Sequence, residues 1–193
     1  TQVEGRSGSL DPKALDNGFK AFRESFVSSK GGFGGVPKFP MPVNQTFLLR
    51  IFARLGDKKA LEMVLHTLRE MAKGGIYDQV GGGFHRYSTD DRWHIPHFEK
   101  MLYDNAQLAV NYLEAYQASR DEDLARVARE TLDYVLRDMT HPEGGFFSAE
   151  DADSLPPELK GKIEDVGHEH QSEGAFYLLT RSEVLDTAGR AAG

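Results

Sequence analysis

Apolar residues return every three or four positions in five long stretches of the chain, which is the spacing of one face of an α-helix. These stretches cover residues 11–28, 44–55, 58–73, 98–118 and 119–139, and a sixth helix is expected to start near residue 180. The stretch 98–118 is apolar nearly all round, which is typical of a helix buried on most sides, whereas 119–139 has one apolar and one charged face. The pattern predicts a mainly α protein.

Capping signals mark the ends of these helices. The predicted N-terminal caps are Asp11 followed by Pro12, Asn44, Ser119 with Glu122, and Thr180 with Glu183. Gly74-Gly75 predicts the end of the third helix.

The segments between the helices alternate in length, since the first, third and fifth connections are long and the second and fourth are short. Helices joined by short breaks pack antiparallel. All the long connections are therefore expected at the same end of the helix layer.

The long connections repeat a phrase of two small residues and an aromatic or apolar residue, for example Gly82-Gly83-Phe84 and Gly144-Gly145-Phe146. Two short strands are predicted at 83–88 and 92–95, with Pro96 ending the second, and another pair at 143–151 and 173–180. This pattern predicts part of an (α/α)6 toroid of antiparallel helical hairpins, with short β-hairpins in the loops on one rim. A purely structural alternative is that the glycines only turn the chain and the aromatics only cap the core. For the arrangement of the helices, the alternative to a closed toroid is a plain α-solenoid.

Composition narrows the function classes. The net charge of −7 makes nucleic acid and anionic membranes poor partners. Residues 141–173 hold nine acids against two lysines, so this segment alone sums to −7, and it is either a solvated insert or an acidic binding surface. The chain has no cysteine, no long apolar run and no signal peptide, so we expect a cytoplasmic protein without thiol chemistry.

Three phrases carry a family resemblance: GGFGGVPKFP, YDQVGGGFHRYSTDDRWHIPHFEKMLYDNAQLA and GGFFSAEDADS with the later EGAFYLLT. Over roughly residues 30–180 they resemble the spermatogenesis-associated, thioredoxin-domain-containing family. The resemblance implies a six-hairpin (α/α) barrel similar to N-acylglucosamine 2-epimerase, cellobiose epimerase and other sugar-active enzymes. It also implies that residues 11–193 form the first part of the barrel, while residues 1–10 are expected to be flexible because they are polar and rich in glycine and serine. The thioredoxin-like domain would lie upstream and the later hairpins downstream of this piece.

The stretch 74–104 holds three histidines, His85, His94 and His97, which we expect on the rim. Epimerisation beside a carbonyl needs a base on one face of the carbon and an acid on the other, and histidine suits both near neutral pH. The similar sugar epimerases use histidines in this way. The alternative is that each histidine is a structural hydrogen bonder.

Four polar residues are predicted in the first two turns of the buried fourth helix: Glu99, Lys100, Tyr103 and Asp104. Charged groups on an apolar helix are either paired or used in function. The spacing of four allows Glu99 to contact Tyr103 and Lys100 to pair with Asp104, while Asp104 is the foremost functional candidate.

Carboxylates of Glu150, Asp151 and Asp153 are expected on the same rim. If Asp151 or Asp153 faces Asp104 or Glu99, the pair suits glycoside hydrolysis; the alternative is a turn cap or an ion pair with Arg86 or Arg92.

Trp93, Phe84 and Tyr87 are candidates for stacking on a sugar ring, although aromatic residues more often pack in cores. Arg86 belongs to the same candidate binding set. Neither a cofactor nor a metal is predicted, because the histidine spacings do not supply three well-placed ligands. The leading hypothesis is a carbohydrate-active domain, epimerase-like or glycosidase-like. The alternative is a non-catalytic helical domain that binds a partner or glycan and accompanies a thioredoxin-like domain.

Overall fold

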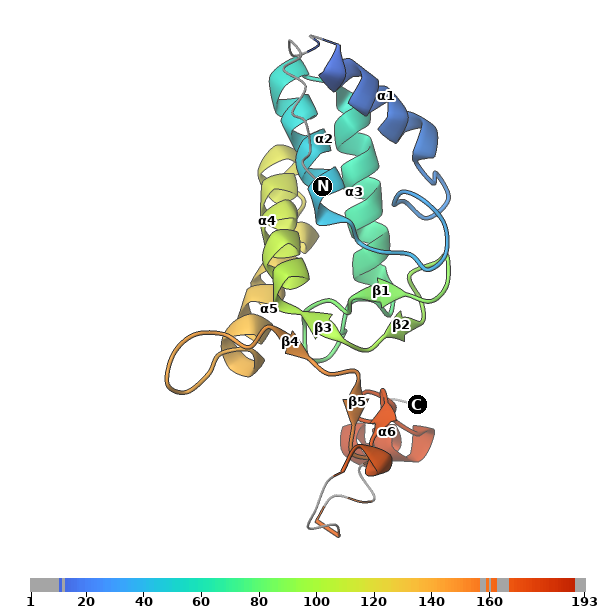
Figure 1. Ribbon diagram of the computed structural model, residues 1–193, viewed down its shortest axis with the longest axis vertical. Coiled ribbons are helices and arrows are strands. Elements are labelled where there is room, and N and C mark those ends of the chain that lie inside the picture. The colour runs from blue at the N-terminus through green and yellow to red at the C-terminus, as the bar shows by residue number, and fades with distance from the viewer. Residues whose placement is uncertain (1–10, 12, 157–158, 160, 163–166, 190–193) are drawn as a thin grey trace, which may run out of the picture.

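The computed structural model describes residues 11, 13–156, 159, 161–162 and 167–189 (Figure 1). The helices are α1 (Ala14–Ser25), α2 (Pro42–Leu55), α3 (Lys58–Lys73), α4 (Leu102–Ser119), α5 (Glu122–Asp138) and α6 (Arg181–Ala188), with a 3-10 helix η2 (His168–His170). The two-residue strands are β1 (Tyr87–Ser88), β2 (Pro96–His97), β3 (Lys100–Met101), β4 (Ala149–Glu150), β5 (Asp153–Ser154) and β6 (Ser172–Glu173). The segment 1–10, which we expected to be flexible, lies outside the described residues, as does part of the acidic insert.

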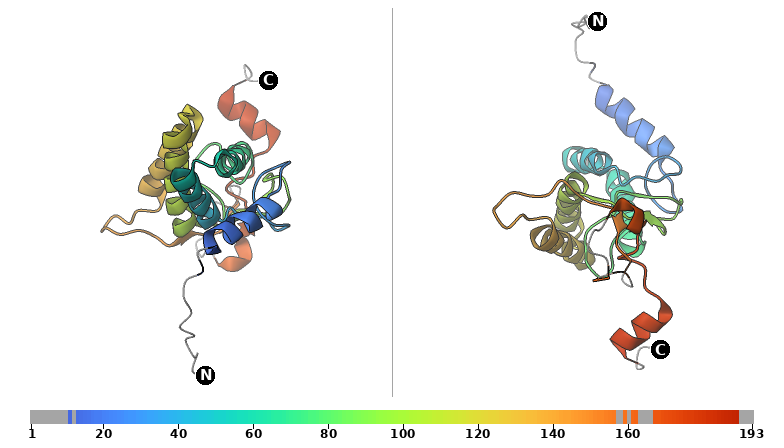
Figure 2. Two further views of the ribbon diagram at one scale, coloured as in Figure 1. Left: turned by 90° about the horizontal axis from the view of Figure 1, so that it is seen from above. Right: turned by 60° about the horizontal axis from the view of Figure 1, so that its bottom comes forward.

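Four helices form the body of the molecule. Helix α2 packs against α3 and α4, and α4 packs against α5, while α1 lies across the outside of this layer (Figures 1 and 2). Fully buried apolar side chains fill the space between them: Leu48, Val64, Leu68, Met71, Leu108, Tyr112 and Val127. The mainly helical fold with small strand pairs is confirmed.

The long connections lie together at one end of this layer, the lower end in Figure 1, as predicted. Lys38, from the first long loop, forms a β-bridge with Ser88 of the second. Strand β3 of the second loop pairs with β4 of the third. The rim is therefore one continuous structure built from three distant segments of the chain.

Several helix starts differ from the prediction. Helix α2 begins at Pro42 rather than after Asn44, and Asp121, not Ser119, caps α5 by accepting a hydrogen bond from the Asp123 N–H. Asp11 accepts a hydrogen bond from the Lys13 N–H, but α1 begins at Ala14. Short polar side chains compete for the same cap, and spacing alone does not rank them. The capping box of α6, formed by Thr180 and Glu183, is confirmed.

The predicted strand pairs were partly wrong, since the first hairpin forms with its second strand shifted and the second pair does not form. Strand β1 pairs with β2, so Tyr87 lies opposite His97 and Pro96 is inside the strand instead of ending it. The segment 143–151 does not pair with 173–180, because β4 joins β3 and β5 joins β6. Two-residue strands are too short for alternation of polar and apolar residues to fix their partners.

Helix α4 begins at Leu102, not at Phe98, because residues 100–101 form β3. The predicted helical pairing of Lys100 with Asp104 was therefore wrong, and Lys100 binds Asp78 instead. Glu99 likewise lies before the helix, where it pairs with Arg86.

The C-terminal segment after β5 stands apart from the helix layer and carries α6 at its end (Figures 1 and 2). Tyr177 anchors it by stacking on Phe98, with ring centroids 5.3 Å apart. No helix in the described part of the chain is long and apolar enough to cross a membrane.

Candidate functional site

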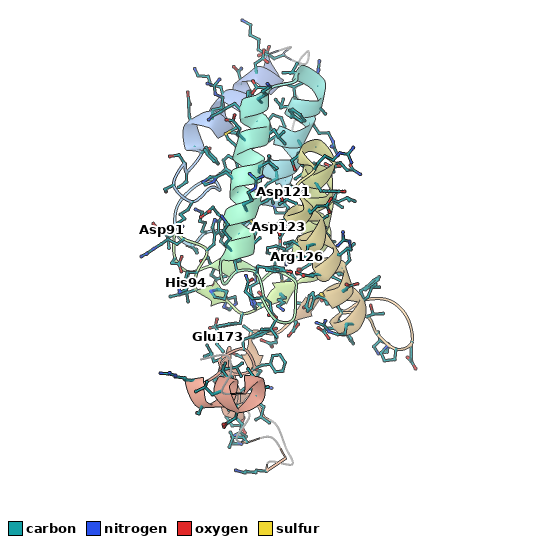
Figure 3. All side chains as sticks on the ribbon, turned by 180° about the vertical axis from the view of Figure 1, so that it is seen from behind. Asp91, His94, Asp121, Asp123, Arg126 and Glu173 are labelled. Carbon is teal, nitrogen blue, oxygen red and sulfur yellow. The ribbon has the colours of Figure 1, made fainter. Side chains whose placement is uncertain are left out.

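A group of polar residues, here called the rim cluster, lies on the long-loop end. Its members are Arg86, Tyr87, His97, Glu99, Asp104 and Glu173. Arg86 and Tyr87 come from the β1 region, His97 from β2, Asp104 from the first turn of α4, and Glu173 from β6. Figure 3 shows Glu173 where the C-terminal segment meets the rest of the protein.

His97 is held between two carboxylates. Its Nδ1 lies 2.6 Å from Oε1 of Glu173, and its Nε2 lies 3.9 Å from Oε2 of Glu99. That Glu99 oxygen accepts a 2.7 Å hydrogen bond from Nη1 of Arg86. The imidazole therefore has one firmly bound nitrogen and one without a close partner among these groups.

Asp104 is buried at 8% exposure and has its pKa raised to about 6. Burial is the main cause, and the nearby Glu99 adds to it, whereas Arg86 acts in the opposite direction. A carboxyl group with this pKa exchanges protons near neutral pH, which is the property required of a general acid or base.

Aromatic rings form one side of the rim cluster. Tyr87 stacks on His97 with ring centroids 4.9 Å apart, and Phe39 packs on Tyr87 at the same distance. Tyr103 and Phe39 are exposed, at 48% and 39%. An exposed aromatic face beside polar groups suits the binding of a sugar ring.

The acidic segment reaches the rim cluster through one cross-strand pair. Asp153 on β5 lies opposite Glu173 on β6, which contacts His97. Like charges directly opposite each other destabilise a strand pair. Asp151 is exposed and accepts a hydrogen bond from the Asp153 N–H, as in the turn-cap alternative. Arg86 pairs with Glu99 and Arg92 with Asp91, so the ion pairs described for these arginines are with other acids.

Behind the rim cluster lies a second polar group, here called the buried network: Asp78, Lys100, Tyr134, Glu150 and Tyr177. Lys100 is 1% exposed and donates to Asp78 Oδ2 at 2.8 Å and to the Gly82 carbonyl at 3.0 Å. Its ammonium lies 4.3 Å and 5.0 Å from the ring centres of Tyr134 and Tyr177. Both tyrosine hydroxyls donate to Glu150. Every member of the network thus has a partner inside it.

Burial would raise the pKa of Asp78, but hydrogen bonds from Lys100 and from the backbone of Gly81 and Val80 hold it below its usual range. Burial also raises the pKa of both Tyr134 and Tyr177, and their hydrogen bonds to Glu150 reinforce this. The tyrosines therefore stay protonated donors.

His85 belongs to the buried side. It is 2% exposed, and its Nδ1 lies 2.9 Å from the Phe98 carbonyl. Burial, and then the charge of Lys100, lower the pKa of His85 to about 4. It is neutral near pH 7 and supports the loop.

The remaining candidates lie elsewhere. Trp93 is fully buried and donates from Nε1 to the Lys30 carbonyl, so its ring has no face open to a ligand. His94 is exposed and lines a cavity of about 500 Å³ together with Lys30, Glu70, Lys73 and Arg92. Figure 3 shows His94 and Asp91 on the loop near the end of α3, apart from Glu173.

A second cavity of about 340 Å³ opens over the buried network, between Val80, Arg137, Phe176 and Leu179. Within the residues that the structure describes, no cluster of three or more histidine or acidic side chains could hold a metal ion.

Sequence reasoning missed Glu173 as a site residue. It lies 76 positions after His97, and their contact depends on the pairing of β5 with β6. Phe39 was missed for the same reason, because only the folded loops bring it to Tyr87.

No family model matches the chain. Among curated proteins, the mouse (Mus musculus) spermatogenesis-associated protein 20 is 52% identical over 170 residues, which cover 86% of this chain and 20% of that protein. The human (Homo sapiens) protein of that name is 51% identical over 170 residues, again 86% of this chain and 20% of that protein. An uncharacterized protein of Caenorhabditis elegans is 38% identical over 173 residues, 86% of this chain and 22% of that protein. The chain thus spans about a fifth of the length of the curated relatives it matches.

Solved structures of sugar epimerases share the fold. The cellobiose 2-epimerase of Spirochaeta thermophila superposes with a TM-score of 0.62 at 22% identity, covering 72% of this chain and 37% of that one. A sugar epimerase from a ruminal bacterium gives a TM-score of 0.61 at 18% identity, covering 69% and 37%. The helices described here therefore correspond to part of an (α/α)6 barrel, as the sequence predicted.

Proposed function

Because the chain is a close homologue of a segment of spermatogenesis-associated protein 20 and shares the fold of sugar epimerases, we propose that it is part of a carbohydrate-active enzyme. The proposed reaction is epimerisation or isomerisation of a reducing sugar at the carbon beside its carbonyl. The rim cluster is the proposed site, and the long-loop end is the mouth of the barrel.

The observation that carries this proposal is the environment of His97. One ring nitrogen is bound to Glu173 at 2.6 Å, while the other lacks a close partner among the neighbouring carboxylates. Asp104, whose pKa is about 6, lies near Arg86 and Glu99, and Glu99 also lies 3.9 Å from His97. In the proposed reaction one of these two groups removes the proton and the other returns one to the opposite face of the carbon.

Arg86 is the proposed partner of the substrate oxygen. Negative charge develops on the carbonyl oxygen when the neighbouring proton leaves, and a fixed cation stabilises it. Glu99 holds the Arg86 guanidinium at 2.7 Å, and Tyr87 and Phe39 supply the aromatic surface for the ring.

The test is proton exchange in heavy water. The longest purified form of the protein that carries this chain is incubated with a panel of aldoses, ketoses and N-acylated hexosamines, and deuterium at the carbon beside the carbonyl is followed by ¹H NMR. We expect exchange with at least one sugar, lost by about 100-fold or more in His97→Gln and Asp104→Asn. The matched control is Lys59→Met, because Lys59 is an exposed residue on α3, and this variant should leave exchange unchanged. Absence of exchange with every sugar would refute the proposed epimerisation or isomerisation.

The carboxylate pair Asp153–Glu173 favours a sub-variant of this proposal, glycoside hydrolysis. Aryl glycosides are added to the same panel, and release of the aryl alcohol with no carbon-bound exchange supports hydrolysis over epimerisation.

A second candidate function is a non-catalytic helical domain that accompanies a thioredoxin-like domain. The ion pairs Arg86–Glu99 and His97–Glu173 favour it, because both pairs are closed within the rim cluster. It predicts that a sugar or partner binds without turnover, and that His97→Gln alters binding but no reaction.

A further inference from the structure

Contacts of the residues that follow Glu173 hold this part of the chain beside His97. The glycine that follows it, Gly174, has φ of +73°, and its N–H donates to the Ala152 carbonyl at 2.8 Å. A Cβ at Gly174 would lie 2.5 Å from the Phe98 ring, so a larger residue would push β6 away from the rim. Tyr177, three residues further on, stacks on the same ring and donates to Glu150. The backbone at Glu173 is therefore held in place by the residues that follow it.

The contact with Glu173 determines which nitrogen of His97 carries the proton. A carboxylate accepts hydrogen bonds, so Nδ1 at 2.6 Å from Oε1 must be the donor. Neutral imidazole carries one proton, which leaves Nε2 with the free electron pair. The fixed tautomer is the one in which Nε2 acts as the base.

Within the part of the chain that the structure describes, the charged groups next to His97 fit this arrangement. Glu99 lies 3.9 Å from Nε2, beyond hydrogen-bond distance, and is bound to Arg86. Asp153 lies opposite Glu173 in the strand pair, and the Tyr87 ring covers one face of the imidazole. When Nε2 accepts a proton, the adjacent Glu173 is placed to stabilise the imidazolium that forms.

We infer that Glu173 is the positioning residue of the proposed site: it orients His97, fixes its Nδ1–H tautomer and stabilises its protonated form. The inference rests on the proposed function for its catalytic meaning. The geometric part, control of the His97 tautomer by a residue 76 positions away, stands independently of it.

The first test measures the tautomer directly. The chain is labelled with ¹⁵N-histidine, and ring nitrogen shifts are recorded at pH 8, with His97 assigned from the signal lost in His97→Phe. We expect a protonated Nδ1 and an unprotonated Nε2. Glu173→Gln, which keeps an oxygen acceptor, should retain this tautomer. Glu173→Ala should lose it, and Glu143→Gln, an exposed acid in the 141–148 loop, should leave it unchanged. An unchanged His97 signal in Glu173→Ala would overturn the inference.

The second test uses the exchange assay. Glu173→Ala should lower kcat by about 10- to 100-fold with little change in KM, and Glu173→Gln should fall between it and the unsubstituted protein. If no form of the protein exchanges any sugar while the tautomer still shifts in Glu173→Ala, the proposed function fails and the positioning of His97 stands. If exchange occurs but kcat is the same in Glu173→Ala, the catalytic part of the inference is overturned.

Discussion

The buried network and the rim cluster are neighbours at the long-loop end of the protein. They differ in how completely their charged groups are paired. Lys100 is 1% exposed, and its ammonium contacts one carboxylate, one carbonyl and two aromatic rings. His97 is 26% exposed on its side chain, with one nitrogen bound and the other open. A saturated charge holds a loop in place, whereas a partly satisfied one keeps capacity for a ligand. The comparison separates residues that build the mouth from residues that can act there.

The largest difference is expected on removing the cation of the buried network. Lys100→Met leaves the Asp78 carboxylate, 12% exposed, without its ion-pair partner, and should lower the free energy of unfolding by about 3–5 kcal/mol. Urea titration monitored by circular dichroism measures the loss. Lys59→Met removes an exposed pair with Glu62 and should change the free energy of unfolding by less than about 0.5 kcal/mol. Equal effects of the two substitutions would contradict the distinction.

Two glycines with nearly the same φ differ in how closely other atoms pack against them, which allows the effect of packing to be separated from that of backbone conformation. Gly83, with φ of +79°, would place a Cβ 2.4 Å from the Tyr134 ring, whereas Gly145, with φ of +80°, has no atom within 4 Å of that position. Gly145→Ala should cost about 1 kcal/mol from the left-handed conformation alone. Gly83→Ala should cost about 2–4 kcal/mol, because the ring in the buried network must also move. Thermal unfolding of the pair measures the difference, and similar melting temperatures would argue against a rigid network.

His85 gives the buried side a distinct pH dependence. Because its folded pKa is about 4, the unfolded chain takes up a proton below about pH 6.5 and the folded chain does not. Its contribution to stability is present above pH 6.5 and is lost as the pH falls toward 4, by about 2–3 kcal/mol. Urea unfolding at pH 4.5 and 7.5 should show a smaller loss of stability in His85→Gln than in the unsubstituted chain. An equal loss would mean that His85 is protonated in the folded state.

Substitution of Asp104 should have the smallest of these four effects on the free energy of unfolding, and it should stabilise the protein at neutral pH instead of destabilising it. Its folded pKa of about 6 lies above its usual value, so the contribution is unfavourable once the carboxyl ionises, between about pH 4 and pH 6. Asp104→Asn should therefore raise the free energy of unfolding at pH 7.5 by about 1–2 kcal/mol and leave it unchanged at pH 4. A destabilised variant at pH 7.5 would show that Asp104 holds the rim together.

The helices and their common loop end could be predicted from the sequence, because the apolar spacing in 58–73 or 119–139 is a local property of the chain. The rim contacts could not. Whether Lys100 meets Asp104 or Asp78 depends on a helix that starts four residues later than its apolar pattern suggests.

Among the candidate site residues, too, those with a local signal in the sequence could be predicted, and those that depend on distant contacts could not. His97 and Asp104 stand out as polar groups within an apolar context, and the structure places both in the rim cluster. Trp93 could not be assigned in the same way, because burial of its ring depends on Gly32 packing against the ring and on Gly74 packing against its backbone. Glu173 had no distinguishing feature among the nine acids of its segment.

The long sequence separation within the rim cluster also has a kinetic consequence. Contacts between residues far apart in the chain form late in folding, because loop closure must precede them. The bond from Glu173 to His97 and the pairing of β5 with β6 depend on such closure, whereas α2 with α3 and α4 with α5 are joined by short local turns. We expect hydrogen exchange to show amides of β4, β5 and β6 opening at lower free energy than those of α4 and α5, so that the mouth can open while the helices stay folded.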